Sequence, residues 1–486
     1  MRLTVTLGLL ALVVALPVRA QQAITFEEAI GLALERNADL RLAEVTRDAS
    51  GLNVSSARAD ALPLPFVSAN IGPTQRYGLS FDQTTGQLVS QTSESLSLSA
   101  SASVDLFSGF RSRRALEQAR HQQDAAVLGL ERTREQVAFD VASRFLQVML
   151  DEEIVRIREQ NVNSQELQLE QVEELVDAGV RAEADVFSQR AGLAQAQGAL
   201  LQAEQAVELS KTRLVEVLQL DPFGEYEFIA PSIEGESLVP EDISLDELLN
   251  AAYASRADLQ AQELTIEAAE AGVSMARSGR YPTVSFSAGF GTNYSSLQQR
   301  LVNPNAPTIS LPLMTEGGET VLLGGEPFEV PIQTPSEFED TPFLTQLSEN
   351  RGGSIGLNIS IPIFDRYQTS RQVQQAQIQV MREEIALERM RQSVAVEVRQ
   401  ALLDYRNAGE QLDVTEAQVA AAEAALEAEQ SRYEFGTGTL VAVTQARTQF
   451  VEAQSARVQA VYQFVFRRKL IDFALGNLEI STVLFD

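Results

Sequence analysis

The stretch S-E-S-L-S-L-S-A-S-A-S-V-D-L-F, residues 93–107, decides the fold of this chain. From Leu96 to Leu106 an apolar side chain occupies every second position, and serine or aspartate fills the positions between. This alternation is typical of a β-strand with one apolar and one polar face. At about 3.3 Å per residue, the strand is long enough to cross a bilayer at a tilt, which takes about 9–11 residues.

Three other segments alternate in the same way, and their polar positions hold mostly serine, glycine and asparagine. One such strand alone would favour the half-buried sheet of an ordinary soluble protein. Four of them, in a chain that begins with an export signal, favour a membrane β-barrel that encloses water. The expected strands span about 66–77, 93–107, 283–294 and 353–364.

The first 20 residues have the form of a secretory signal peptide. Arg2 is followed by the apolar run Leu7–Leu16 and by the small-residue cleavage site Val18-Arg19-Ala20. No later stretch reaches the length of about 18 apolar residues that a transmembrane helix needs. We therefore expect an exported protein that does not reside in the inner membrane. The chain has no cysteine, which excludes disulfides and thiolate metal sites.

The composition argues against nucleic-acid binding and against catalysis. The formal net charge is −29, and so acidic a chain does not bind nucleic acid non-specifically. There is a single histidine, and the sequence contains no nucleophile–base pair, phosphate-binding loop or metal-ligand spacing. The many acidic residues stand at helical spacing beside arginine and glutamine, as on solvated helix faces. We expect no enzyme activity, no cofactor and no metal site.

The sequence contains two related halves. Ile24–Leu40 is echoed by Ile243–Leu259 at a spacing of 219 residues. Beyond the strands the spacing becomes 257, which carries Arg190 onto Arg447. The extra 38 residues are an insertion between the third and fourth strands. We expect a tandem duplication, with a first repeat at 21–242 that ends in a linker at 221–242, and a second repeat at 243–486.

Each half also contains a very long stretch without proline, rich in alanine, glutamine, glutamate and arginine. Apolar residues recur along it at steps of 3, 4 and 7, which is typical of a coiled-coil seam. The seam positions are Val137, Val141, Phe145, Val148 and Val155, repeated as Val394, Val398, Leu402, Tyr405 and Leu412. The expected helices span about 110–176 and 367–435, each followed by a shorter one, at about 183–218 and 440–475. At 1.5 Å per residue each long helix measures about 100 Å.

Four strands cannot close a membrane barrel, because bacterial barrels have at least about 8. An open sheet edge in lipid would leave backbone N–H and C=O groups unpaired. The copies must therefore pool their strands. Small serine and glycine side chains fill an 8-stranded barrel poorly, so we expect three copies and about 12 strands rather than two copies. The stretch 295–352, with seven prolines, is expected to be a long loop between the last two strands.

These features resemble those of the TolC-like outer-membrane efflux protein family, over nearly the whole chain that follows the signal peptide. The order of elements and the duplication carry the resemblance more than any single motif. The matching segments are L-F-S-G-F-R-S-R-R-A from Leu106, I-P-I-F-D-R from Ile361, A-G-V-R from Ala178, F-G-T-G-T-L from Phe435, L-Q-L-D-P from Leu218 and F-A-L-G from Phe473.

The resemblance implies an α+β membrane protein built from a tandem duplication. Its trimeric 12-stranded β-barrel, with four strands per chain, would lie in outer-membrane lipid and continue as a long α-helical coiled-coil barrel through the periplasm. The homotrimer would be the channel of a tripartite efflux or type I secretion system. Such channels dock on a periplasmic adaptor (membrane fusion) protein, and through it on an inner-membrane pump or ATPase.

The resemblance also implies roles for two turns at the helix tips. Gly179 and Val180 match the first turn that meets the adaptor, and Gly436 and Thr437 match the second. The glycines also have a simpler explanation, because a turn with positive φ prefers glycine.

A gate near the same turns is implied less directly. Asp185 matches an aspartate that in some members pairs with an arginine of the second tip, where this chain has Gly438. Ala442 and Gln445 stand where some members have entrance aspartates. We hypothesise a different latch, and the alternative role for Asp185 is a favourable charge in the first turn of a helix. The candidate gate residues are Arg181, Glu183 and Asp185.

Two other functions stay open at this point. A stand-alone outer-membrane diffusion porin would need no adaptor. A periplasmic coiled-coil spacer or adhesin would leave the four alternating strands unexplained. The exported substrate cannot be read from a duct lined by serine, glycine and asparagine.

Overall fold

A computed structural model describes residues 22–81, 87–229, 239–302, 308–333 and 338–476. The expected signal peptide, residues 1–20, and part of the expected linker lie outside these ranges. The chain divides into two compact units. Of the described residues, the helical unit comprises 22–55, 117–229, 239–271 and 376–476, and the strand unit comprises 56–81, 87–116, 272–302, 308–333 and 338–375.

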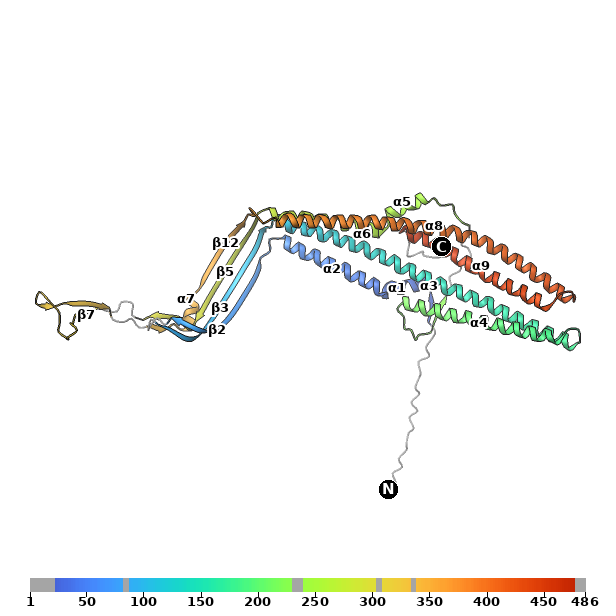
Figure 1. The fold of residues 1–486 in the computed structure, drawn as a ribbon, viewed down its shortest axis with the longest axis horizontal. Coiled ribbons are helices and arrows are strands. Elements are labelled where there is room, and N and C mark those ends of the chain that lie inside the picture. The colour runs from blue at the N-terminus through green and yellow to red at the C-terminus, as the bar shows by residue number, and fades with distance from the viewer. Residues whose placement is uncertain (1–21, 82–86, 230–238, 303–307, 334–337, 477–486) are drawn as a thin grey trace, which may run out of the picture. The chain divides into compact units, whose positions relative to one another are not determined.

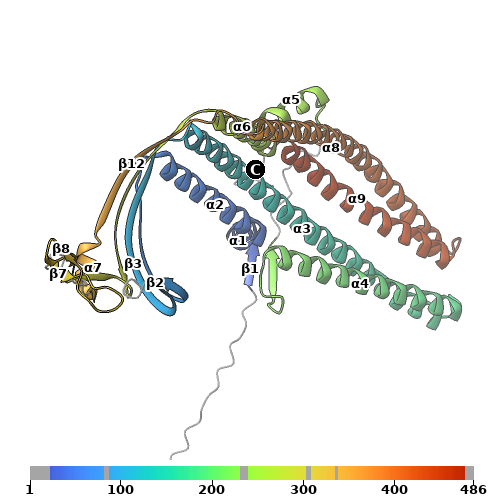
Figure 2. The ribbon, with the colours of Figure 1, turned by 60° about the vertical axis from the view of Figure 1, so that its left-hand side comes forward.

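The strand unit is built on one four-stranded antiparallel sheet (Figure 2). Its strands are β2 (Phe66–Phe81), β3 (Leu88–Phe107), β5 (Thr283–Ser295) and β12 (Gly352–Ser360). Their order in the sheet is β12-β5-β3-β2, so β2 and β12 are the edges. The sheet joins strands of both repeats, because β3 of the first pairs with β5 of the second.

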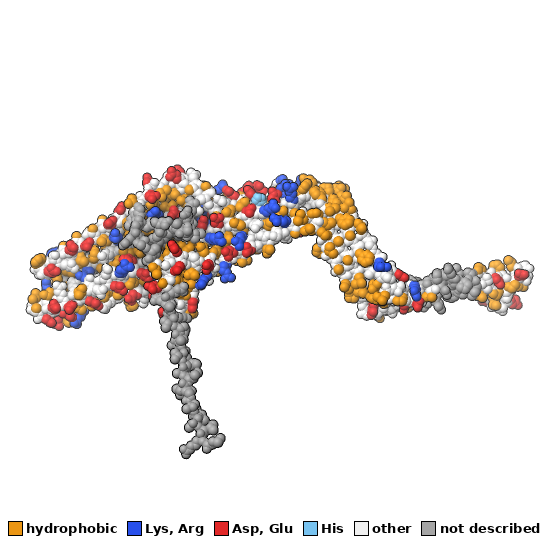
Figure 3. Space-filling view, turned by 180° about the vertical axis from the view of Figure 1, so that it is seen from behind, with side chains coloured by type: hydrophobic (Ala, Val, Ile, Leu, Met, Phe, Trp, Pro, Cys, Tyr) orange, Lys and Arg blue, Asp and Glu red, His pale blue; other side chains and the backbone are white. Residues whose placement is uncertain are grey.

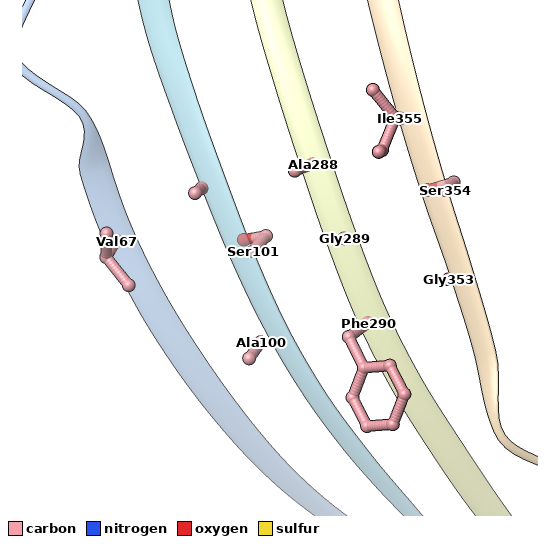
Figure 4. A pocket seen from close by; sticks show the side chains of 10 residues that line it. Val67, Ala100, Ser101, Ala288, Gly289, Phe290, Gly353, Ser354 and Ile355 are labelled. Atoms are coloured by element: carbon pink, nitrogen blue, oxygen red, sulfur yellow. The ribbon is translucent and has the colours of Figure 1, made fainter.

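The register of the sheet places the alternating side chains in two sets of rows (Figure 4). One row is apolar and consists of Val67, Ala102, Ala288 and Ile355. The next is polar or small and consists of Ser68, Ser101, Gly289 and Ser354. Because successive residues of a strand point to opposite faces, these rows lie on opposite faces of the sheet. No described residue covers the apolar face at its two edge strands, since Val67 is 68% and Ile355 80% exposed.

The fourth strand ends earlier than the alternation suggests. It stops at Ser360, whereas the expected strand ran to about 364. Pro362 follows two residues later and has no backbone N–H to donate to a sheet ladder.

The expected loop 295–352 contains regular structure. Three short antiparallel pairs are nested within it, β6 with β11, β7 with β10 and β8 with β9. Gly324 and Gly325 form the innermost two-residue turn, with φ of 67° and 93°. Positive φ at both central residues is what such a hairpin turn requires. The elements are β6 (Gln299–Leu301), β7 (Thr308–Pro312), β8 (Leu322–Leu323), β9 (Glu326–Pro327), β10 (Glu329–Gln333), β11 (Phe338–Asp340) and the helix α7 (Phe343–Glu349).

Helices make up most of the remaining described residues (Figure 1). They are α1 (Phe26–Arg36), α2 (Ala38–Ala61), α3 (Arg111–Asp177), α4 (Glu183–Val217), α5 (Leu245–Ser255), α6 (Ala257–Arg277), α8 (Gln368–Glu434) and α9 (Leu440–Leu475), with a short 3₁₀ turn at Ser278–Arg280. Within the helical unit, α4 runs beside the second half of α3, and α9 beside the second half of α8 (Figures 1 and 2). Within the described residues, no helix carries a segment long and apolar enough to cross a membrane.

The two seams form two separate cores in the helical unit. Val137, Val141, Phe145 and Val148 pack against α1, and each is at most 4% exposed. Their repeats on α8 pack against α5 in a second cluster. The expected seam is confirmed at these positions, although Val155 is only half-buried.

A short parallel pair of strands was not expected. β1 (Gln22–Thr25) pairs with β4 (Tyr226–Ile229), and Ile24 and Phe228 enter the first core. Each of these strands has four residues, too short for an alternation to be recognised in the sequence.

Candidate functional site

The candidate site is formed by the two turns at the ends of the longest helices, all within the helical unit. The first turn joins α3 to α4, and the second joins α8 to α9. Gly179 has φ 71° and Gly436 has φ 72°. A left-handed glycine just after the last helical residue is a common way to end a helix. A Cβ built on either glycine would meet no atom within 4 Å, so backbone conformation rather than space selects glycine here.

The two turns have the same hydrogen bonds, residue for residue. In each, the glycine N–H donates to the carbonyl three residues earlier, and the next N–H donates to the carbonyl five residues earlier. The pairs are Gly179 to Val176 (2.9 Å) and Val180 to Leu175 (2.9 Å), then Gly436 to Tyr433 (3.0 Å) and Thr437 to Arg432 (2.9 Å). Each donor and acceptor in one turn lies 257 residues from its counterpart in the other. The duplication therefore extends to the hydrogen bonds of the tips.

The four turn residues expected to meet an adaptor are all exposed. Val180 is 66% exposed, and the neighbouring Phe435 is 83% exposed. Phe435 was not among the expected site residues. Two apolar side chains thus stand in water beside polar backbone at the tips. Adaptor contact by these turns stays a prediction.

The two short helices begin differently. Thr439 caps α9, since its Oγ1 accepts a hydrogen bond from Ala442 N at 3.2 Å. Ala182 stands at the same place before α4 and has no side-chain oxygen. Instead, Glu183 and Asp185 lie in the first turn of α4, where negative charge is favourable beside the helix N-terminus.

The three candidate gate residues do not form an ion pair with one another. Arg181 pairs with neither Glu183 nor Asp185 among the ion pairs of the described residues. Its guanidinium carbon lies 4.1 Å from the centre of the Tyr433 ring. The same guanidinium donates a hydrogen bond to the backbone carbonyl of Tyr433. Arg181 therefore links the first tip to the second within one chain.

Tyr433 is the functional candidate that the sequence did not reveal. It is 7% exposed and belongs to a small apolar cluster just behind the two turns. Burial raises the pKa of Tyr433, the charge of Asp185 raises it further, and the charge of Arg181 opposes both. Its counterpart in the first repeat is Val176, so the internal repeat gave no signal at this position.

The structure also gives a reason for the missing arginine at Gly438. A Cβ at this residue would lie 3.0 Å from Tyr433 N and 3.1 Å from Arg432 C, both backbone atoms. Such contacts are tighter than those of ordinary Cβ atoms, so a side chain here would require the helix end to shift. Arg181 occupies the corresponding place in the first tip.

The cluster behind the tips holds the two hairpins together. It contains Val172, Val186, Tyr433, Leu440 and Val443, which come from α3, α4, α8 and α9. Within the described residues, no group of three His, Cys, Asp or Glu side chains could hold a metal ion. The geometry of the site suits contact with a macromolecule, since exposed turns are held on a packed base.

Comparison with known proteins gives the same architecture. The family model described as outer membrane efflux protein matches residues 29–218 and 248–477, one segment in each repeat. Outer membrane protein TolC of Escherichia coli (strain K12) is 22% identical over 444 residues, which are 91% of this chain and 80% of that protein.

Two solved structures resemble the chain closely in fold. A structure of CusC superposes with a TM-score of 0.71 at 16% identity and covers 93% of this chain and 92% of that one. The outer membrane channel CmeC of Campylobacter jejuni superposes with a TM-score of 0.70 at 16% identity, over 94% and 89% of the two chains. Because the family model covers most of the sequence, the chain belongs to the outer membrane efflux protein family, as an efflux channel of the outer membrane and not an enzyme.

Proposed function

We propose that three copies of the chain form one duct that gives substrates passive exit across the outer membrane. The observation that carries this proposal is the four-stranded sheet with two open edges, at β2 and β12. In lipid an unpaired edge is costly, because its N–H and C=O groups have no partner. Three sheets joined edge to edge give about 12 strands and leave no edge.

The two faces of the sheet support the same proposal. The apolar face is exposed, and Figure 3 shows hydrophobic side chains gathered over the strands. The opposite face carries serine, glycine and asparagine, which suit the wall of a water-filled channel. Outer-membrane lipid is therefore the partner of one face and water of the other. Nucleic acid is not a partner, because the net charge is −29.

The exposed tips support docking in the periplasm. Val180 and Thr437 stand on turns fixed by hydrogen bonds and backed by a buried cluster. We expect them to contact a periplasmic adaptor that connects the duct to an inner-membrane pump or a secretion ATPase. The helical part then lies in the periplasm.

The gate is proposed at the same tips, around Arg181, Glu183 and Asp185. Arg181 holds the end of α8 through Tyr433, and Asp185 lies near enough to raise the pKa of that tyrosine. Loss of the Asp185 charge should loosen this arrangement and raise single-channel conductance. Glu204→Ala is the matched control, since Glu204 is an exposed acidic residue of the same helix and lies outside the candidate gate. Unchanged conductance in Asp185→Ala rules out a role of Asp185 in the gate.

Photo-crosslinking in cells tests the docking. A photoreactive residue is placed at position 180 or 437, and the captured proteins are identified by mass spectrometry. A probe at Leu201, exposed within α4, is the control for non-specific capture. An adaptor of a proton-driven pump would indicate small-molecule efflux, and an adaptor of a secretion ATPase would indicate protein export. Self-crosslinks alone would favour the stand-alone porin and overturn the docking proposal.

A further inference from the structure

A pocket of about 540 Å³ lies just behind the tips, between α3, α8 and α9. Two cationic side chains, Arg181 and Arg447, line this pocket. Three neutral polar side chains, Gln168, Gln430 and Tyr433, also line it. The proposed docking at the exposed turns makes no use of Arg447.

Arg447 is a buried cation that takes part in no ion pair within the described part of the chain. Its residue is 8% exposed, and its Nε and Nη1 atoms have no hydrogen-bond partner among the described residues. Three further buried polar atoms of the same lining also lack a partner, and they are Arg181 Nε, Tyr433 Oη and Gln168 Oε1. Buried polar groups are normally hydrogen-bonded, so a concentration of unpaired polar atoms in one pocket, most of them donors, requires an explanation.

In the first repeat, the arginine that corresponds to Arg447 has a carboxylate partner. Arg190, which lies 257 residues before Arg447, forms an ion pair with Glu173 through Nη2 and Oε1 at 2.8 Å. The residue 257 positions after Glu173 is Gln430, which lines the pocket beside Arg447. The second repeat has thus kept the arginine and replaced its carboxylate by a neutral amide.

The charge of Arg447 remains despite its burial. Burial lowers the pKa of Arg447, but arginine stays protonated in proteins. A buried charge is costly unless it is paired, so an incoming anion would be bound favourably. Glu434 also lines the pocket, but its side chain is exposed and takes part in none of the ion pairs of the described residues.

We propose that this pocket binds a compact oxyanion, a carboxylate or a phosphate-type group, in the place that Glu173 occupies in the first repeat. The guanidinium of Arg447 offers parallel N–H donors that match two oxygens of such a group. Arg181 Nε and the Tyr433 hydroxyl are further donors in the same lining. The site links the ligand to the residues that join the two tips, and it does not depend on adaptor docking.

Isothermal titration calorimetry of the purified, detergent-solubilised protein tests the proposal. Sodium phosphate and sodium acetate are titrated separately against a sodium chloride background of matched ionic strength. We expect saturable binding of at least one of the two, weakened at least tenfold in Arg447→Gln and in Gln430→Glu. The second variant keeps the cation but supplies the carboxylate within the chain. Arg190→Gln is the matched control, and its affinity should equal that of the wild type.

The two titrants also distinguish the sources of the anion. Binding of acetate alone indicates a carboxylate-bearing ligand, and binding of phosphate indicates a phosphate-bearing one. Circular dichroism at 222 nm verifies that each variant is folded, which is convenient in a chain without tryptophan. The proposal is overturned by an absence of binding in the wild type. Binding to Gln430→Glu as tight as to the wild type overturns it as well.

Discussion

The guanidinium of Arg181 lies 4.1 Å from the centre of the Tyr433 ring and joins the first helix tip to the second. Such a contact contributes about 0.5–1 kcal/mol where exposed and about 2 kcal/mol where desolvated. Tyr433 is 7% exposed, so the larger figure is the relevant one. The same arginine also donates to the Tyr433 carbonyl, which fixes its position over the ring.

We expect Arg181→Ala to loosen both turns. Amide hydrogen exchange of Val180 and Thr437, whose N–H groups close the two turns, should accelerate about tenfold or more. Tyr433→Phe is the control, because it keeps the ring and removes only a hydroxyl that has no hydrogen-bond partner in the described segments. Equal exchange in Arg181→Ala and the wild type would show that the contact does not hold the tips.

Three glycines with positive φ allow two effects of a substitution to alanine to be measured separately. These are the free-energy cost of a left-handed backbone and the cost of steric contact at the added Cβ. Gly179, Gly436 and Gly476 have φ of 71°, 72° and 70°. An alanine in this conformation costs roughly 1–2 kcal/mol. At the first two positions a Cβ meets nothing within 4 Å, whereas at Gly476 it meets the Arg256 Cα at 3.1 Å.

We therefore expect Gly179→Ala and Gly436→Ala to destabilise the protein equally, by about 1–2 kcal/mol. Gly476→Ala should cost clearly more, since the end of α9 must also move away from Arg256. Denaturant unfolding of the three variants, each compared with the wild type, measures these differences. Equal costs at all three positions would contradict the crowding at Gly476.

A buried ion-pair network predicts a pH dependence. Arg256 is 4% exposed and donates to both carboxylate oxygens of Asp258 at 3.0 and 2.8 Å, and to Glu397 at 2.8 Å. Burial alone would raise the pKa of Asp258, but the hydrogen bonds and charge of Arg256 outweigh it, so the pKa is lowered. A carboxyl whose pKa is lower in the folded state stabilises that state above its unfolded pKa, about 3.9.

The stabilisation is fully present at neutral pH and is lost as the pH falls below about 4. We expect Asp258→Asn to lower the free energy of unfolding at pH 7, and the difference from the wild type to shrink toward pH 3. Asp39→Asn is the matched control, because Asp39 is the exposed counterpart in the first repeat. A difference for Asp258→Asn that does not change with pH would refute the assignment.

The alternating strands and periodic helices could be predicted from the sequence because both patterns are set by which side chains face lipid, water or core. The expected ends of the long and short helices agree with the structure to within one residue, for example at Glu183 and Leu475. Glycines after each long helix and proline near the sheet mark these boundaries locally. Such signals do not require knowledge of distant contacts.

The site itself was only partly predictable. The turns at Gly179 and Gly436 could be found, because a left-handed turn leaves a glycine in the sequence. The link between Arg181 and Tyr433 could not, since 252 residues separate them and neither has an equivalent in the other repeat. The lack of a carboxylate partner for Arg447 could be recognised only from the structure, which has Arg447 and Gln430 in the lining of one pocket.

The segment between β5 and β12 is fastened by one buried side chain. Gln346 in α7 is 1% exposed, accepts a hydrogen bond from Ser295 N at 2.8 Å, and donates to Ser295 O and Thr341 O. Its removal leaves the buried Thr341 carbonyl and the part-buried N–H and carbonyl of Ser295 without these hydrogen bonds, and a fully buried group left unpaired costs about 1–3 kcal/mol. We expect Gln346→Ala to make the segment markedly more sensitive to limited proteolysis. Leu344→Ala, at a position 77% exposed, should leave the cleavage rate unchanged, and equal rates in both variants would contradict the role of Gln346.

The two faces of β12 should respond oppositely to the same substitution. Ile355 belongs to the exposed apolar row of the sheet, and Ser354 to the polar row on the other face. An arginine on the lipid face of a membrane barrel costs about 2–4 kcal/mol near the middle of the bilayer, while a lumen-facing one is solvated. In a trimer this free-energy cost applies to each of the three copies. Ile355→Arg should therefore strongly reduce the amount of assembled protein in outer-membrane fractions. Ser354→Arg should assemble normally and instead lower the single-channel conductance. If Ser354→Arg fails to assemble while Ile355→Arg succeeds, the faces are reversed and the apolar row does not contact lipid.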